Sequence, residues 1–477
     1  MAANDLPGYI RSAAPVPAAN RAAWFKNTAP SYAGIFLWFA FYQSLGDSLS
    51  LSSLGMVLVG IVLAGLICHF LFYYVPGLLG MRTGLPLYIV GTSTFGTQGG
   101  YFLPGIFMGL LQIGWYSVGT FFAVKLILNG LGMPAITLYG PPEAGQAAAF
   151  DIKFAVFAII WGYLFAFIGA KGITYVARMN QFFPIVPIVL LIVGFLYALP
   201  YIGAFQTPAA TATQSAAGAC ACACPCAGML LIIQLIVGFT ATAAAVGTDF
   251  CTNARDKRDV QLGGLVGIFL AILFTAGLAM LTVAGAHGKD PKMASWTYGD
   301  ALEALSPIGG RVMLILFAIG SMAPACFCSF IIGNSLSTML SKPNSRIPIT
   351  MAGATVGIVL AVTGVSANLA PYFGLIGASF GPVVGAMAAD WLLSGRKWSG
   401  PRQGINVAGY AAWLVGFLVG ISNNGMVTAA LGRELLAGWH PTGVYSFVVG
   451  FVVYYALAGL RPPVIEGAVQ TVNPEAT

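Results

Sequence analysis

Charged residues are scarce in this sequence. Only 7% of its 477 residues are Asp, Glu, Lys or Arg, whereas 58% are hydrophobic. A soluble globular protein carries about 25% charged residues, and a soluble chain of this length needs polar side chains to cover its surface. The composition therefore excludes a soluble multidomain protein and leaves lipid as the solvent for much of the surface.

Motifs of soluble enzymes are absent as well. The sequence has no phosphate-binding loop, no His-Glu-x-x-His pair, no nucleophile elbow and only 3 histidines. The net charge is +7, but the basic residues form no patch with interleaved aromatic residues. Nucleic acid is therefore not predicted as a partner. We predict that the protein is not an enzyme and has no cofactor. Without an ATP-binding motif, any uphill transport has to use an ion gradient.

Long apolar segments take the place of these motifs. A run of about 18 or more apolar residues is long enough to span a bilayer as a helix. About twelve such segments are predicted, near residues 31–50, 53–79, 101–130, 150–171, 175–201, 227–250, 262–286, 311–340, 347–366, 368–394, 404–422 and 442–460. Glycine is abundant, at 61 residues, which suits close helix packing in a membrane. We therefore expect an all-α integral membrane protein.

The basic residues lie mostly on one side of these segments. With the N-terminus in the cytoplasm, the cytoplasmic segments hold most of the Lys and Arg residues, including Arg255, Lys257 and Arg258. Positively charged loops tend to stay in the cytoplasm. We predict a multi-pass protein of the plasma (inner) membrane with both termini cytoplasmic.

One predicted external loop has an unusual composition. Residues 207–226 read TPAATATQSAAGACACACPC and end in alternate cysteines, Cys220, Cys222, Cys224 and Cys226. Alternate cysteines can bind a soft metal or form disulfides. Their spacing differs from the two-residue gap of a zinc knuckle, and no histidine lies nearby. We favour a flexible loop without a metal, and the sequence assigns these cysteines no role.

The third predicted span carries a polar side chain beside an aromatic one. Gln112 and Trp115 are three residues apart in GLLQIGWYSVG, so they share one face of the helix. An amide beside an indole offers hydrogen bonds and a stacking surface, which suits a flat heterocycle. The alternative is an interhelical hydrogen bond of Gln112 with Trp115 as a packing residue, because a buried amide needs a partner in lipid. Spacing alone does not separate these two interpretations.

Three other spans contain features expected of broken helices. In the sixth, Gly238 before Phe239 suggests local unwinding, and in the first, Gly34 suggests a break whose carbonyls coordinate a cation. In the eighth, Pro324 should kink the helix near Ser321, whose hydroxyl could face a cation. Asp249 and Asp390 end the sixth and tenth spans, and we interpret both as solvated carboxylates at helix ends, the alternative being ionic latching of an inner gate.

Three segments together resemble the nucleobase–cation symporter family, which includes cytosine, purine–cytosine, allantoin and hydantoin transporters. They are LLGMRTGLPLYIVGTSTFGTQGGYFLPG followed by LLQIGWYSVG, then VGFTATAAAVGTDFCTNARD, and finally FGPVVGAMAADWLLSGRKW. The pattern is nearest to that of bacterial cytosine permeases. The resemblance implies two inverted five-helix repeats with helices 1 and 6 interrupted, plus two further helices. It therefore predicts a cytoplasmic N-terminal tail (1–30), a first repeat (31–201), an external loop (202–226), a second repeat (227–394), two additional helices (395–461) and a C-terminal tail (462–477).

The resemblance also implies a site at mid-membrane. Gln112 would hydrogen-bond a base, Trp115 would stack on it, and Gly238 and Phe239 would complete the sandwich. The implied cation ligands are the carbonyls of Gly34, Leu37 and Ala318 and the hydroxyl of Ser321. Sodium-coupled members have a second hydroxyl residue after the serine, whereas this chain has Met322 there. The coupling ion is therefore expected to be Na⁺ or H⁺.

We predict a secondary active transporter that imports a nucleobase or a related heterocycle by cation symport. The alternative is a symporter of the same architecture for an amino acid or another small solute, which would hold a carboxylate with broken-helix N-termini. A channel would need charged rings or a repeated filter sequence, and neither is present. The expected partners are the heterocycle and the lipid bilayer, and the sequence indicates no oligomeric state.

Overall fold

The computed structural model consists almost entirely of helices, as the apolar segments predict. It describes residues 6–133, 135–139, 148–172, 175, 183–208, 225–436, 440–467, 469 and 471. Within this described part no β-strand is formed, and two isolated bridges pair Ala22 with Ala254 and Arg402 with Val464. Cys220, Cys222 and Cys224 lie outside the described residues, whereas Cys226, directly before α12, is disulfide-bonded.

The first half of the chain begins with short helices and continues with long ones. Its elements are α1 (Gly8–Arg11), η2 (Ala18–Asn20), η3 (Trp24–Lys26), α2 (Thr28–Phe36), α3 (Phe39–Tyr42), η4 (Leu45–Ser50), α4 (Leu54–Ile67), η5 (Cys68–Tyr73), α5 (Tyr74–Thr83), α6 (Leu87–Val90), α7 (Thr92–Phe95), η6 (Tyr101–Ile106), α8 (Phe107–Gly130), α9 (Ile152–Ala170), α11 (Ile185–Ala198) and η7 (Leu199–Ala204). The elements η5 and η6 are π-helical turns that continue directly into α5 and α8.

The second half also combines short and long helices. Its elements are α12 (Ala227–Ala245), α13 (Gly247–Cys251), α14 (Lys257–Gly264), η8 (Leu265–Leu270), α15 (Ala271–Lys289), α16 (Tyr298–Leu305), α17 (Pro307–Gly320), α18 (Met322–Met339), η9 (Pro343–Ser345), α19 (Arg346–Thr363), η10 (Val365–Ala367), α20 (Leu369–Leu393), α21 (Val407–Ile421), α22 (Gly425–Leu431), α23 (Thr442–Ala456) and η11 (Ala458–Leu460). We call α21, α22 and α23 the accessory helices.

Every predicted span has a helical counterpart, although three do not contain one unbent helix long enough to cross a membrane. Among the described residues, nine helices are long and apolar enough to cross a membrane, or ten if the bent pair α21 and α22 counts as one span. The first predicted span is instead divided into α2, α3 and η4, and α23 has 15 residues. About 20 residues of helix are needed to cross a bilayer core. For the first span, the α21–α22 pair and α23, the length of the apolar segment therefore did not predict the length of the helix.

Helices 1 and 6 are interrupted, but not at the glycines that suggested a break. The chain leaves the helix at Trp38, whose φ of −71° and ψ of 128° are extended. In the sixth span, α12 runs unbroken through Gly238 and ends at Ala245, so the prediction of unwinding at Gly238 is wrong. A Cβ at Gly238 would collide with the backbone carbonyl of Phe373. This glycine permits a close helix contact rather than a break.

In the eighth span, where Pro324 predicts a kink, the helix is interrupted at one residue. Helix α17 ends at Gly320 and α18 begins at Met322, which places Pro324 in the first turn of α18. Proline has no N–H to donate to the carbonyl four residues earlier, and here that carbonyl belongs to Gly320. Pro324 therefore explains why the helix is interrupted at Ser321.

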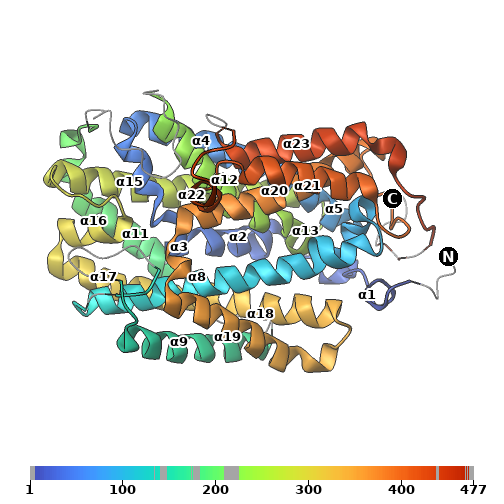
Figure 1. Cartoon of the computed structure of the whole chain (residues 1–477), viewed down its shortest axis with the longest axis horizontal. Coiled ribbons are helices and arrows are strands. Elements are labelled where there is room, and N and C mark those ends of the chain that lie inside the picture. Colours follow the sequence, from blue (N-terminus) through green and yellow to red (C-terminus); the bar gives the residue numbers. More distant parts are fainter. Residues whose placement is uncertain are drawn as a thin grey trace.

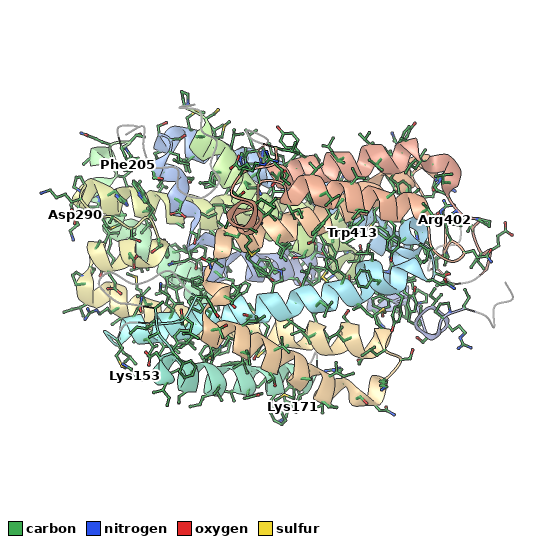
Figure 2. All side chains as sticks on the ribbon, viewed as in Figure 1. Lys153, Lys171, Phe205, Asp290, Arg402 and Trp413 are labelled. Atoms are coloured by element: carbon green, nitrogen blue, oxygen red, sulfur yellow. The ribbon has the colours of Figure 1, made fainter. Side chains whose placement is uncertain are left out.

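The helices form an elongated bundle, and both ends of the chain lie at one end of it (Figure 1). The N-terminal helix α1 and the last described residues lie at the same end, where the Tyr9 hydroxyl donates to the Thr97 carbonyl (2.6 Å) and Arg402 donates to the Pro462 carbonyl (3.0 Å). We call this the terminal end. Figure 2 shows Arg402 near it and Asp290 near the opposite end. Charged groups at both ends of an apolar bundle fit a protein that spans a membrane.

Asp390, at the terminal end of α20, is not the solvated carboxylate that its position at a helix end suggested. It is 3% exposed and accepts hydrogen bonds from Tyr454 (2.8 Å), Arg402 (3.4 Å) and Arg461 (3.4 Å). Two guanidinium groups offset the cost of burying this carboxylate. The cluster ties α20 to α23 and to the chain that follows each helix.

Candidate substrate site

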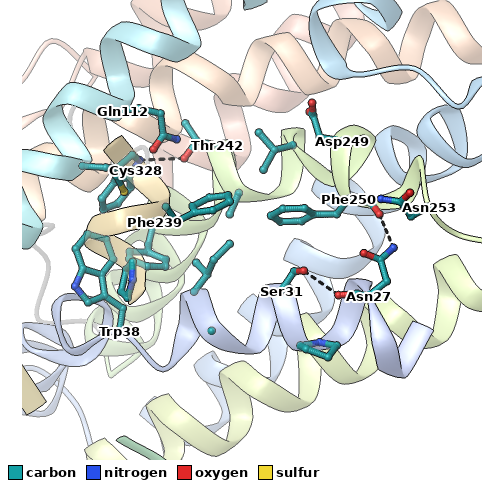
Figure 3. Close-up of a pocket in the computed structure, with 18 of the residues that line it drawn as sticks. Asn27, Ser31, Trp38, Gln112, Phe239, Thr242, Asp249, Phe250, Asn253 and Cys328 are labelled. Carbon is teal, nitrogen blue, oxygen red and sulfur yellow. Dashed lines mark hydrogen bonds between the residues drawn. The ribbon is translucent and has the colours of Figure 1, made fainter. Parts of the chain in front are cut away.

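A cavity of about 480 Å³ lies between α2, α8, the α12–α13 pair and α18 (Figure 3). Its lining residues are Lys26, Asn27, Pro30, Ser31, Gly34, Ile35, Trp38, Gln112, Trp115, Phe239, Thr242, Ala243, Val246, Asp249, Phe250, Asn253, Pro324, Phe327 and Cys328. Lys26 belongs to the N-terminal segment that also carries α1, and the Asn253 carbonyl accepts the backbone N–H of Ala22 in that segment at 2.8 Å. The cavity therefore opens toward the terminal end of the bundle.

The deep part of the cavity contains the amide predicted from sequence. Gln112 on α8 is 7% exposed, and its Nε2 donates to the sulfur of Met108 one turn earlier at 3.8 Å. No other hydrogen bond to Gln112 is formed by the described residues. A sulfur is a weak acceptor. The Gln112 amide is therefore free to exchange this contact for a stronger partner in the cavity.

Trp115 both lines the cavity and is packed into the bundle. Its indole N–H donates to the Thr242 hydroxyl of α12 at 3.2 Å. Its ring meets the rings of Phe239 at 5.1 Å and Tyr372 at 5.0 Å, both nearly perpendicular, and it is 5% exposed. Edge-to-face aromatic pairs add about 0.5–1.5 kcal/mol beyond area burial. The packing and binding interpretations of Trp115 are thus compatible in this geometry.

The two residues predicted from α12 have different environments. Phe239 lines the cavity between Trp38, at 6.3 Å between ring centroids, and Trp115. Gly238 is not a lining residue and instead lies against Phe373 of α20. The structure therefore brings Gln112, Trp115 and Phe239 together around one space, and places Gly238 behind it.

The four residues predicted to bind a cation are not gathered in this space. Gly34 lines the cavity, whereas Leu37, Ala318 and Ser321 do not. The Leu37 carbonyl accepts the Tyr42 hydroxyl at 3.4 Å, and the Ser321 hydroxyl donates to the Phe317 carbonyl at 3.0 Å. Within the described part of the chain, no group of three or more His, Cys, Asp or Glu side chains could hold a metal ion.

The mouth of the cavity is polar, and of the residues described below sequence analysis singled out Asp249 alone, as a solvated carboxylate at a helix end. Asn27 donates to the Phe250 carbonyl at 2.9 Å, and the Ser31 hydroxyl donates to the Asn27 carbonyl at 2.8 Å (Figure 3). Asp249 accepts the backbone N–H of Leu87 at 3.3 Å. These residues come from two segments more than 200 positions apart in the sequence, so no local pattern could have predicted their meeting.

An ion pair beside the mouth helps to hold the N-terminal segment. Arg255 donates to Asp259 at 2.7 Å, and Asp259 also accepts the backbone N–H of Trp24 at 3.2 Å. The hydrogen bonds to Asp259 raise the pKa of the Arg255 guanidinium. The pair therefore stays charged and fixes the segment that leads into α2.

Comparison with known proteins links this geometry to one family. The family described as permeases for cytosine/purines, uracil, thiamine and allantoin matches residues 15–450. The cytosine permease of Escherichia coli strain K12 is 24% identical over 362 residues, which cover 74% of each chain. The putative allantoin permease of the same strain is 22% identical over 422 residues, which cover 80% of each chain.

Solved structures show the fold. Mhp1, a nucleobase-cation-symport-1 family transporter, aligns in a closed conformation with bromovinylhydantoin bound at a TM-score of 0.66 and 15% identity, covering 95% of this chain and 97% of that one. Its inward-facing conformation aligns at 0.64 and 15% identity, covering 97% and 98%. The predicted all-α transporter fold is thus confirmed over nearly the whole chain.

The same fold also occurs with another cargo. A mutant form of the manganese transporter of Eremococcus coleocola aligns at a TM-score of 0.52 with 12% identity, covering 92% of this chain and 94% of that one. Fold similarity alone therefore does not identify a substrate. The side chains around the cavity and the family match have to do so.

Proposed function

The chain belongs to the family of permeases for cytosine/purines, uracil, thiamine and allantoin, and on this basis we propose that it imports a nucleobase or a related flat heterocycle by secondary active transport. One observation carries the proposal. Gln112, Trp115 and Phe239 surround the deep part of a 480 Å³ cavity. An engineered cavity of about 150 Å³ holds benzene, so a single heterocycle fits here with room to enter and leave.

Each of these side chains has a role that suits a flat polar ring. The Gln112 amide both donates and accepts hydrogen bonds, which matches the N–H and C=O groups along the edge of a base. The aromatic rings of Trp115 and Phe239 offer stacking surfaces, and a base stacked on an aromatic side chain gains about 1–3 kcal/mol. Gly238 contributes indirectly, because its lack of a side chain lets α20 approach α12.

Transport would proceed by alternating access. With both termini in the cytoplasm, as the placement of Lys and Arg predicts, the cavity opens toward the cytoplasm and the structure represents the inward-facing state. Substrate would then be released past Ser31, Asn27 and Asn253. The protein would reside in the plasma (inner) membrane.

Coupling to Na⁺ or H⁺ belongs to the same proposal. The proposed Na⁺ ligands are the carbonyls of Gly34, Leu37 and Ala318 and the hydroxyl of Ser321. Of these, Gly34 borders the cavity and Ser321 lies at the break between α17 and α18. Helix breaks free carbonyl groups that can coordinate a cation. Protons are the alternative, since Met322 replaces a second hydroxyl.

Uptake assays test the function directly. Transporter-deficient cells expressing the protein should accumulate at least one of radiolabelled cytosine, hypoxanthine and allantoin, with and without Na⁺ at two pH values. Gln112→Ala should raise the KM about tenfold, because one or two hydrogen bonds of about 1 kcal/mol each are lost. Gln261→Ala, an exposed glutamine on α14, is the matched control and should leave the KM unchanged.

Two outcomes would contradict the proposal. Uptake that is inhibited by free amino acids and not by bases would favour the amino-acid symporter. Uptake of a base that is indifferent to Gln112→Ala and Trp115→Ala would retain the function but reject the proposed site.

A further inference from the structure

The helix α20 is held in two different ways along its length. From Gly377 onward it packs directly on the accessory helices. A Cβ at Gly385 would collide with the Phe447 carbonyl, and one at Gly450 would collide with Pro382. Surfaces that meet at this distance are packed as closely as a protein interior. This part of α20 is therefore packed tightly against the accessory helices.

The first turns of α20 carry the aromatic lid, which we define as Tyr372 and Phe373. Both rings contact Trp115, with centroids at 5.0 and 5.7 Å, and Phe373 also contacts Phe239 at 5.3 Å. The Tyr372 hydroxyl donates to the Leu111 carbonyl of α8 at 3.1 Å. The lid therefore packs against Trp115 and Phe239, which line the deep part of the substrate cavity.

A second, smaller cavity lies behind the lid. It has a volume of about 80 Å³ and is lined by Ala370, Pro371 and Gly374 of α20, together with Gln234, Asn424 and other residues of α12 and the accessory helices. A cavity needs about 10–15 Å³ of such volume to hold a water molecule, so this polar space has room for water. Of α20, the first two turns border this second cavity and the later turns do not.

Asn424 connects these turns to the accessory helices across the second cavity. Its Nδ2 donates to the Pro371 carbonyl at 2.7 Å, and its Oδ1 accepts the Met426 N–H at 3.0 Å, which caps α22. The bend of 74° between α21 and α22 brings this side chain over α20. A Cβ at Gly374 would lie 2.8 Å from the Asn424 Nδ2, so glycine is needed there for the amide to approach.

We propose that Asn424 is a positioning residue for transport, and that its hydrogen bond to Pro371 holds the aromatic lid closed. The accessory helices thereby set the ratio of lid-open to lid-closed protein, although they lie outside the two repeats and do not line the substrate cavity. This inference rests on the proposed function, because alternating access supplies the two states.

The substitution Asn424→Asp separates this role from helix capping. Aspartate is as good an N-cap as asparagine, so α22 keeps its cap. A carboxylate has no N–H, however, and the bond to Pro371 is lost. Asn423→Asp is the matched control, because the Asn423 amide next to it bonds the backbone of Leu436, also accepting its N–H at 3.1 Å.

Two thiols report the two states. Cys328 lines the large cavity and is accessible when the lid is closed and the mouth is open. Leu235→Cys places a thiol at a site that is 2% exposed, borders the second cavity and lies one turn before Phe239 on the same face of α12. Opening of the lid would expose it. The ratio of Leu235→Cys labelling to Cys328 labelling is proportional to the open-to-closed ratio, whichever state dominates.

Labelling uses N-ethylmaleimide on purified protein in nanodiscs, with each cysteine quantified by peptide mass spectrometry. Asn424→Asp should raise the labelling ratio about fivefold, the change in an equilibrium constant that one neutral hydrogen bond supports. Gly374→Ala should raise it in the same direction, since its methyl displaces the amide without weakening the helix. Asn423→Asp should leave the ratio unchanged.

Two results would overturn the inference. A ratio unchanged in Asn424→Asp would show that the bond does not hold the lid. An equal rise in Asn423→Asp would assign the effect to the loop as a whole. Neither measurement needs a transported substrate, so failure of cytosine, hypoxanthine and allantoin uptake would reject the proposed function and leave this test standing.

Discussion

The proposed site has a substrate half, made of the residues proposed to bind the heterocycle, and a cation half, made of the proposed ion ligands. The structure gathers the residues of the first half but not those of the second. Gln112, Trp115 and Phe239 already surround one cavity, on helices that are continuous at those positions. Among the proposed cation ligands, only Gly34 reaches it. Side chains on unbroken helices are therefore gathered in this conformation. The positions of the carbonyl ligands depend instead on where two helices break and on how closely the two breaks approach each other.

The largest effect is expected in the substrate half, at Trp115. Trp115→Ala removes a stacking surface worth up to about 3 kcal/mol, so the affinity for the base should fall about 100-fold. Trp115→Phe keeps an aromatic face but loses the hydrogen bond to Thr242, and should cost about fivefold. Equilibrium binding of radiolabelled base to purified protein measures both.

The pair of substitutions also tests what Trp115 does. If alanine and phenylalanine reduce affinity equally, the Thr242 bond and not stacking is responsible. A thermal-melting control on each variant shows whether the fold around Tyr372 and Phe239 has survived.

The substrate half was the more predictable half for a physical reason. Gln112 and Trp115 lie three residues apart on a helix, and this spacing alone places them on one face. Their cavity-facing position follows from α8 being continuous there. Trp38 also borders the cavity, but its position depends on the break directly before α3, so no periodic pattern could have identified it.

The positions of the breaks in the first and sixth spans could not be predicted from the sequence. Glycine destabilises a helix, but it also lets two helices approach closely. A glycine in the sequence does not show which of these two roles it has. Gly238 has the second role, against Phe373. Pro324 was more informative, because a proline inside a helix always removes the hydrogen bond to the carbonyl of the preceding turn.

A matched pair of glycine substitutions sharpens this distinction. Gly238→Ala should destabilise the protein by about 1–3 kcal/mol, because the added methyl collides with the Phe373 carbonyl. Gly34→Ala meets no atom within 4 Å, and alanine favours the helix by about 1 kcal/mol relative to glycine. The melting temperature should therefore fall in the first variant and stay level or rise in the second. Equal losses would contradict the assignment of Gly238 to close packing.

The smallest expected effect lies in the cation half, at Ser321. The Ser321 hydroxyl donates a hydrogen bond to the Phe317 carbonyl at 3.0 Å, which leaves the oxygen lone pairs available to a cation. If Na⁺ is the coupling ion, Ser321→Ala should raise the half-saturating Na⁺ concentration about tenfold, since a polar contact to a charged group contributes about 1.5 kcal/mol or more. Met322→Thr adds a second hydroxyl beside it and should lower that concentration. If protons are the coupling ion, uptake should rise as the pH falls, and neither substitution should make it depend on Na⁺. If Ser321→Ala leaves the Na⁺ dependence of uptake intact, the cation binds elsewhere. The difference between the two halves of the site would then reflect a wrong assignment of ligands rather than the conformation.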